Sequence, residues 1–341
     1  MPDQKHIVIL GSAYPLRGGG LSTFNERLAR EFMSEGCKVT IYTFSLQYPS
    51  FLFPGKTQYS TEPAPGDLDI KVKVNSVNPL NWLMVGRELK KLKPDILIVR
   101  YWLPFLGPAL GTICKQARKN GHTRVICIAD NVVPHEKRPG DHMFTKYFLA
   151  SADAFITMSE KVMNDLASFK TGKPAILTDH PLYDNFGAPV SKTEARKHLE
   201  LPQQTKLILF FGFIRHYKGL DILFEAMAEP TIRRAGIKLL VAGEFYQDSR
   251  QYLDQIDKLG IGDSVILHSD FIPDNEVKYY CCAADFIIQP YRNATQSGVT
   301  PLAYHFEKPM VVTNVGGLPS MVPNEKVGLV TNPEPSDIAA A

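Results

Sequence analysis

The chain opens with His6-Ile-Val-Ile-Leu-Gly-Ser-Ala-Tyr-Pro-Leu-Arg-Gly-Gly-Gly20, and a pattern of the same kind returns at Leu207-Ile-Leu-Phe-Phe-Gly-Phe-Ile-Arg-His-Tyr-Lys-Gly219. Each stretch is an apolar run typical of a buried strand, followed by glycine and basic residues and then by a helical pattern. The free N–H groups and the dipole of a helix N-terminus favour an anion. Two such turns, one in each half of the chain, predict two nucleotide-fold domains that face each other across a cleft.

The rest of the sequence repeats the alternation of strand and helix. Strands are expected at Ile7–Leu10, Lys38–Thr43, Ile70–Val74, Ile96–Val99, Val125–Ile128, Ala154–Thr157, Leu207–Phe211, Lys238–Val241, Val265–Leu267, Phe286–Gln289 and Met310–Thr313. Helical patterns separate them, which implies right-handed crossovers and parallel sheets. In such doubly wound sheets, ligands bind beyond the carboxyl ends of the strands. The informative loops are therefore those that follow strands.

The domain boundary is expected in a stretch of different composition. Residues 171–205 hold prolines at 174, 181, 189 and 202 and one charged helical pattern, Ser191–Leu199. A length of 341 residues suits two domains rather than a single core. We predict Rossmann-like α/β domains over residues 1–180, on the acceptor side, and 181–341, on the donor side.

Composition narrows the class of protein. An apolar fraction of 44% with 21% charged residues is ordinary for a globular chain and argues against disorder. The five cysteines are odd in number and scattered without metal-site spacing, which favours a reducing cytoplasm and no bound metal. No signal peptide or membrane-spanning stretch is recognisable. We therefore expect a cytoplasmic protein.

The small net charge of +3 is unevenly distributed. Residues 1–190 hold 23 Lys+Arg and 17 Asp+Glu, a balance of +6, and residues 191–341 hold 15 and 18, a balance of −3. A basic first half could favour peripheral contact with an anionic membrane or a phosphate-bearing acceptor, although ordinary solvated surface charge explains it as well. No dense basic block is interleaved with aromatic residues, which argues against nucleic acid as a partner.

The first glycine turn matches no common nucleotide motif. Gly18, Gly19 and Gly20 form neither Gly-x-Gly-x-x-Gly nor a P-loop, which ends in Gly-Lys-Ser/Thr. A plain flexible turn and a close backbone approach to a ligand both remain open.

The second turn carries two cations, Arg215 and Lys218, within four residues. An arginine can fork onto phosphate oxygens and a lysine supplies a point charge, so the pair could neutralise a leaving nucleoside diphosphate.

Two further loops follow strands. Gln296, Ser297, Gly298 and Val299 come after strand Phe286–Gln289 and open a helix that Ser297 could cap, with N–H groups near Gly298 and Val299 directed at a ligand. Asp130, Asn131 and His135 follow strand Val125–Ile128. These residues could orient or deprotonate an acceptor hydroxyl, or serve only as a cap and a structural histidine.

Together these features resemble the retaining glycosyltransferases of family 4, which have the GT-B architecture. The resemblance rests on both glycine turns, on Ala283-Ala-Asp-Phe-Ile-Ile-Gln-Pro290 and on Glu307-Lys-Pro-Met-Val-Val-Thr-Asn-Val-Gly-Gly-Leu-Pro319. Such enzymes transfer a sugar from a nucleoside-diphosphate sugar, keep its anomeric configuration and need no metal for the diphosphate. The donor sugar is then a co-substrate, and no cofactor is expected.

The resemblance also implies roles for single residues. Lys218 and Arg215 would hold the donor diphosphate, and the Gln296–Val299 turn would contact the donor sugar and phosphate. Gly18–Gly20 would meet both substrates near the cleft, and Glu244 is assigned to the same donor-binding set. Asp130 would orient the acceptor, with Asn131 and His135 on the acceptor side.

The sequence departs from the family pattern in four places. Ala294 and Leu302 stand where the family often has two glutamates, and Phe213 or Gly212 where its arginine usually lies. Asp130 replaces a histidine that is common after the fifth strand. The sequence also ends where the family usually continues through a helix that crosses back to the first domain.

These observations favour a retaining hexosyltransferase that acts on a glycan or lipid-linked acceptor. Two alternatives stay open: a catalytically degenerate subunit that binds nucleotide sugars, and a nucleotide-sugar epimerase.

Overall fold

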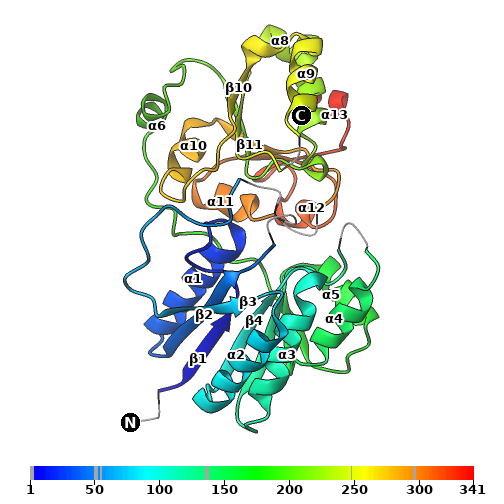
Figure 1. The fold of residues 1–341 in the computed structure, drawn as a ribbon. Coiled ribbons are helices and arrows are strands. Elements are labelled where there is room, and N and C mark those ends of the chain that lie inside the picture. Colours follow the sequence, from blue (N-terminus) through cyan, green and yellow to red (C-terminus); the bar gives the residue numbers. More distant parts are fainter. Residues whose placement is uncertain (1–3, 50–52, 54–55, 135–137, 247, 295–296) are drawn as a thin grey trace. The chain divides into compact units, whose positions relative to one another are not determined.

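A computed structural model of the chain describes residues 4–49, 53, 56–134, 138–246, 248–294 and 297–341 (Figure 1). The chain is divided into two compact units, Met1–His180 and Pro181–Ala341. Each unit holds one β-sheet whose strands all run parallel, with the intervening helices packed on it. The described part of the chain therefore has the expected fold, two Rossmann-like α/β units.

The sheet of the first unit has the strand order β3-β2-β1-β4-β5-β6-β7. Its strands are β1 His6–Leu10, β2 Lys38–Leu46, β3 Ile70–Asn75, β4 Ile96–Tyr101, β5 Arg124–Ala129, β6 Ala154–Thr157 and β7 Ala175–Leu177. The sequence predicts the first six but places β7 in the linker. β7 is a three-residue edge strand with every residue exposed, and its apolar run is too short to mark a buried strand in the sequence.

The helices of the first unit cover its sheet and enclose an apolar core. They are α1 Gly20–Ser34, α2 Pro79–Leu92, η2 Pro104–Leu106, α3 Gly107–Arg118, α4 Asp141–Leu149 and α5 Glu160–Ser168. The helical pattern in the sequence predicts a helix over Trp82–Leu92, and α2 begins three residues earlier, at Pro79. The Asn78 side chain accepts hydrogen bonds from the Leu80 and Asn81 N–H groups, and Pro79 occupies the first helical position. Both are standard signals for the start of a helix.

The sheet of the second unit has the strand order β10-β9-β8-β11-β12-β13. Its strands are β8 Leu207–Phe211, β9 Lys238–Ala242, β10 Val265–His268, β11 Phe286–Gln289, β12 Met310–Thr313 and β13 Gly328–Thr331. The helices are α6 Lys192–His198, η3 His216–Lys218, α7 Leu220–Ala228, α8 Pro230–Ala235, α9 Arg250–Leu259, η4 Gly262–Ser264, α10 Val277–Ala283, α11 Val299–His305, α12 Leu318–Met321 and α13 Pro335–Ala340. The sequence prediction does not include β13, whose four residues are only partly buried or exposed, or the helices α8, α12 and α13, which span too few residues to show a period.

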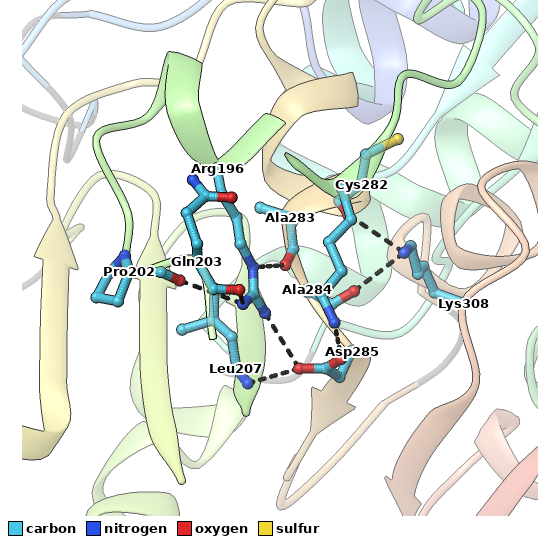
Figure 2. Close-up of polar contacts among 10 residues, drawn as sticks. Arg196, Pro202, Gln203, Leu207, Cys282, Ala283, Ala284, Asp285 and Lys308 are labelled. Carbon is cyan, nitrogen blue, oxygen red and sulfur yellow. Dashed lines mark hydrogen bonds and ion pairs between the residues drawn. The ribbon is translucent and has the colours of Figure 1, made fainter. Parts of the chain in front are cut away.

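The linker that the sequence predicts over residues 171–205 includes α6, which is anchored to the second unit. The Arg196 side chain is only 1% exposed, and it donates hydrogen bonds to the carbonyl oxygens of Ala283, Pro202 and Gln203 (Figure 2). It also pairs with Asp285, which accepts a hydrogen bond from the Leu207 N–H at 2.7 Å. These contacts fix the start of β8 and of β11, the two central strands of this sheet.

None of the described helices is both long enough and apolar enough to cross a membrane.

Candidate functional site

The loops after β8, β9, β11 and β12 meet at the carboxyl edge of the second sheet. β8 pairs with β9 on one side and β11 on the other, so the order of the strands reverses between β8 and β11. This is the switch point at which doubly wound sheets bind ligands. Arg215 and Lys218 follow β8, Glu244 follows β9, and Ser297, Gly298 and Val299 follow β11. The fold therefore brings the predicted donor-binding residues that the structure describes in this unit to one edge.

The backbone at this edge depends on glycine. Gly212 has φ +96° and Gly243 has φ +145°, conformations that side chains disfavour. A Cβ on Gly243 would lie 2.3 Å from the Gly212 carbonyl oxygen, and one on Gly316 would lie 1.5 Å from the Ala294 carbonyl oxygen. Glycine at these positions lets the loops pack directly on one another.

Lys218 is the most unusual residue of this edge. Lys218 is only 8% exposed, and its Nζ lies 5.6 Å from the centre of the Tyr291 ring. Burial, and then the like charge of Arg215, lower the pKa of Lys218 to about 7. Among the described residues, no carboxylate forms an ion pair with Lys218. A buried ammonium without a counter-charge is costly, which makes this position suited to an anionic ligand.

Arg215 lies beside Lys218 but is exposed. Its guanidinium carbon is 4.9 Å from the centre of the Tyr246 ring, and Tyr246 stacks on Phe213 at 4.2 Å. The backbone on either side is fixed, since the Ile214 N–H donates to the Glu244 carbonyl oxygen at 2.9 Å. Glu244 itself is buried, 2% exposed, and this main-chain contact places it beside the loop that carries Arg215.

The turn before α11 differs from the prediction. Gly298, not Ser297, is the N-cap residue of α11, and the Ser297 Oγ accepts a hydrogen bond from the Val299 N–H at 3.2 Å. The side chain of Ser297 bonds within its own turn, so the N–H of Val299 is already engaged rather than directed at a ligand. Gln296 lies outside the described residues. Gly298 is exposed, and a Cβ at this position would lie 3.4 Å from the ring of Tyr183.

The two family glutamate positions are filled by buried apolar residues. Ala294 is 2% exposed and Leu302, in α11, is 3% exposed. Leu302 therefore serves the packing of α11. Neither residue has a side chain that could bind a hydroxyl group.

Sequence reasoning missed Arg292 and Asp221. The two side chains form a forked ion pair, with Nη1–Oδ1 at 2.5 Å and Nη2–Oδ2 at 2.7 Å. The Arg292 N–H also donates to the Tyr217 carbonyl oxygen at 2.7 Å. The two residues are far apart in sequence, and each follows a different strand. Only their place after the adjacent strands β8 and β11 could have suggested the contact.

In the first unit, the glycine turn leads directly into α1. Gly19 is the N-cap residue with φ +115°, and its N–H donates to the Thr23 Oγ1 at 2.9 Å. A Cβ on Gly20 would meet no atom within 4 Å among the described residues. Gly19 thus adopts a conformation with positive φ that favours glycine, while Gly20 has open space beside it. Gly18 precedes them in the same turn.

Asp130, just after β5, is held in a forked ion pair. Arg100, at the end of β4, donates from Nε to Oδ2 at 2.5 Å and from Nη2 to Oδ1 at 2.6 Å. The Arg100 side chain is 3% exposed, and its guanidinium carbon lies 3.8 Å from the centre of the Phe24 ring. Next to Asp130, the buried Oδ1 of Asn131 has no hydrogen-bond partner among the described residues. His135 lies outside those residues.

A metal centre is not evident in the described part of the chain, where no group of three or more His, Cys, Asp or Glu side chains could hold an ion. The cysteines Cys114, Cys127, Cys281 and Cys282 are buried thiols. Burial raises the pKa values of Cys114, Cys127 and Cys281, as expected of packing residues.

Comparison with known proteins identifies the family. Residues 18–178 match the model of Glycosyltransferase Family 4, and residues 205–341 match that of Glycosyl transferases group 1. A D-inositol 3-phosphate glycosyltransferase of Thermobifida fusca is 26% identical over 94% of this chain and 79% of that protein.

Solved structures show the same fold. The sucrose-phosphate synthase of Thermosynechococcus elongatus superposes with a TM-score of 0.73 at 18% identity, covering 99% of this chain and 88% of that one. The Anabaena protein HepE, solved in complex with UDP and glucose, gives a TM-score of 0.70 at 16% identity, covering 99% and 88%. With both units matched by models of these transferases and the fold shared throughout, the chain belongs to glycosyltransferase family 4 and has the GT-B fold.

Proposed function

We propose that the protein transfers a hexose from a nucleoside-diphosphate sugar to a hydroxyl group of a glycan or lipid-linked acceptor, with retention of the anomeric configuration. The observation that carries the proposal is Lys218, a buried cation that no carboxylate pairs with among the described residues. The D-inositol 3-phosphate glycosyltransferase relative and the UDP complexes of HepE agree with a nucleotide-sugar donor.

In this proposal the bond between the anomeric carbon and the diphosphate oxygen breaks, and the diphosphate leaves with additional negative charge. Lys218 and Arg215 offset that charge where it develops, which is the main electrostatic demand of the reaction. No cofactor is required, because these two cations supply the positive charge. The acceptor hydroxyl attacks on the same face, and its proton leaves with the diphosphate.

The remaining predicted residues keep their proposed roles. Glu244, Ser297, Gly298 and Gln296 belong to the donor side of the second unit. Asp130 and its neighbours Asn131 and His135 belong to the acceptor side of the first unit. The carboxylate of Asp130 would accept a hydrogen bond from the acceptor hydroxyl.

Binding of nucleoside diphosphates tests the donor site. We expect one of ADP, GDP, UDP, CDP and TDP to raise the melting temperature selectively, because a ligand that binds only the folded state stabilises it. Lys218→Met should weaken the binding of that nucleotide by about 10- to 100-fold. The control is Lys206→Met, since Lys206 is an exposed lysine directly before β8, at the other end of the strand. Unchanged affinity in Lys218→Met would contradict the proposal.

A second candidate is a subunit that binds nucleotide sugars but does not transfer them. The buried apolar side chains of Ala294 and Leu302, at positions where the family often has glutamates, favour it. Transfer of sugar label from the selected nucleotide sugar to an extracted glycan or lipid fraction separates the two functions. Binding without transfer to any fraction supports the degenerate subunit. Conversion of the donor sugar without an acceptor would instead support an epimerase.

Peripheral membrane contact on the inner face of a membrane is also proposed, supported by the balance of +6 over residues 1–190. Sedimentation with phosphatidylglycerol vesicles tests it. Binding should be lost at high salt and should not occur with phosphatidylcholine vesicles.

A further inference from the structure

Lys218 lies on a short element that needs outside support. η3 His216–Lys218 is a single turn of 3-10 helix, and such turns have poor hydrogen-bond geometry of their own. The same turn must hold a buried ammonium in place. The contacts that η3 makes with its surroundings therefore decide where the Lys218 charge lies.

The segment Pro290–Arg292, which follows β11, makes several of those contacts. The Arg292 N–H donates to the Tyr217 carbonyl oxygen at 2.7 Å, and the Arg292 Nη1 lies 3.4 Å from the His216 carbonyl oxygen. A Cβ on Gly219 would lie 1.9 Å from the Pro290 carbonyl oxygen, so the two backbones are in direct contact. Main chain and side chain of one residue, Arg292, thus bind two of the three η3 residues.

Arg292 is itself fixed by Asp221, in the first turn of α7. Burial raises the pKa of Asp221, but the hydrogen bonds and charge of Arg292 outweigh it, so that the pKa of this carboxyl is lowered. The guanidinium therefore links three parts of the chain, namely the loop after β11, η3 and the start of α7. Because a fork fixes direction as well as distance, a lysine could not reproduce this geometry.

We propose that Arg292, held by Asp221, is a positioning residue that fixes η3 and so sets the place of the Lys218 ammonium. This inference rests on the proposed donor site. Arg292 acts through Lys218 and is not itself a ligand of the diphosphate. The groups that face Lys218 are Arg215, the ring of Tyr291 and the backbone of Gly212, with Tyr217 adjacent on η3.

Binding of the nucleoside diphosphate selected by the thermal-shift panel tests the inference. Arg292→Met and Arg292→Lys should each weaken binding roughly tenfold. Arg30→Met is the matched control, because Arg30 forms a similar forked ion pair with Asp67, and neither residue belongs to a donor loop. If an Arg292 variant fails to fold, Asp221→Asn, which keeps the size of the side chain and weakens the fork, takes its place.

Two readouts separate positioning from a general loss of stability. In the Lys218→Met background, Arg292→Met should have no further effect on affinity, because its effect passes through Lys218. In the wild type, affinity should fall as the pH rises above about 7, where the ammonium loses its proton. In Arg292→Met we expect η3 to loosen, so that water reaches Lys218 and its pKa rises toward the ordinary value. The loss of affinity should then begin at a higher pH than in the wild type.

The outcomes are distinct. Additive losses in the double variant, or a pH dependence identical to that of the wild type, would overturn the positioning role while leaving the donor site intact. An Arg292→Met variant that binds as tightly as the wild type would overturn it as well. If none of the five nucleoside diphosphates binds the wild type, or if Lys218→Met binds normally, the proposed donor site fails and this inference fails with it.

Discussion

The Nζ atom of Lys218 lies directly beside Gly212, so that a Cβ on Gly212 would be 2.9 Å from it. A side chain at Gly212 would therefore require the Lys218 ammonium to shift. The absence of a side chain at the end of β8 is what gives the Lys218 charge room at the carboxyl edge of the sheet.

Gly212→Ala should displace the ammonium and weaken binding of the nucleoside diphosphate several-fold. It should also lower the free energy of unfolding by about 1–2 kcal/mol, since φ is +96° at this position. Gly236→Ala is the control, because Gly236 has φ +63° and no atom within 4 Å of its Cβ position. Urea unfolding should show a similar loss for both variants, and calorimetric titration a loss of affinity only for Gly212→Ala. Equal affinities would contradict the steric argument.

Lys218→Met should stabilise the ligand-free protein. The pKa of Lys218 is lowered from its ordinary value of 10.5 to about 7 in the folded state. Between these two pH values the unfolded state keeps a proton that the folded state releases, and this difference lowers the free energy of unfolding. Replacing the buried amine by an apolar chain of similar length removes this penalty, which we expect to be about 1–3 kcal/mol, or a few degrees in Tm. Scanning calorimetry without nucleotide at pH 7 measures it. A Tm lower than that of the wild type would show that the ammonium is already compensated.

The same pKa predicts that nucleotide binding takes up a proton. Near pH 8 the Lys218 amine is mostly neutral in the empty site, and an anionic diphosphate favours its ammonium form, so its pKa rises on binding. Titration calorimetry in buffers of different ionisation enthalpy should therefore show uptake of up to about one proton per site at pH 8, falling toward zero below pH 6. Lys218→Met should show no such uptake. Uptake that persists in that variant would assign the proton to another group.

The fold could be predicted from the sequence because it depends on short-range patterns. The apolar run Leu207–Phe211, the glycine after it and the helical pattern from Leu220 together specify a strand, a turn and a helix without reference to the rest of the chain. The strand β7 and the helix α12 could not be predicted in this way. They are three and four residues long, and tertiary contacts rather than periodicity determine them.

The candidate site could be predicted only in part. Arg215 and Lys218 stand out in sequence because both cations lie in one turn, but the burial of Lys218 and the exposure of Arg215 depend on how the loop packs. The pairing of Arg292 with Asp221 could not be predicted, because it joins a loop to the start of α7, and only the strand order brings these two segments together. For the same reason, the sequence showed Asp130 as a candidate acid but not its partner Arg100 on the neighbouring strand.

Asp130→Asn should reduce turnover without changing affinity for the nucleoside diphosphate. In our proposal the Asp130 carboxylate accepts a hydrogen bond from the acceptor hydroxyl, and a hydrogen bond to a charged group contributes about 1.5–3 kcal/mol, or about 10- to 100-fold in rate. The variant also leaves the Arg100 charge uncompensated, which lowers stability, so kcat should be measured well below its Tm. Arg100→Gln combined with Asp130→Asn restores a neutral hydrogen-bonded pair and should regain stability but not turnover. Recovery of kcat in the double variant would assign Asp130 a purely structural role.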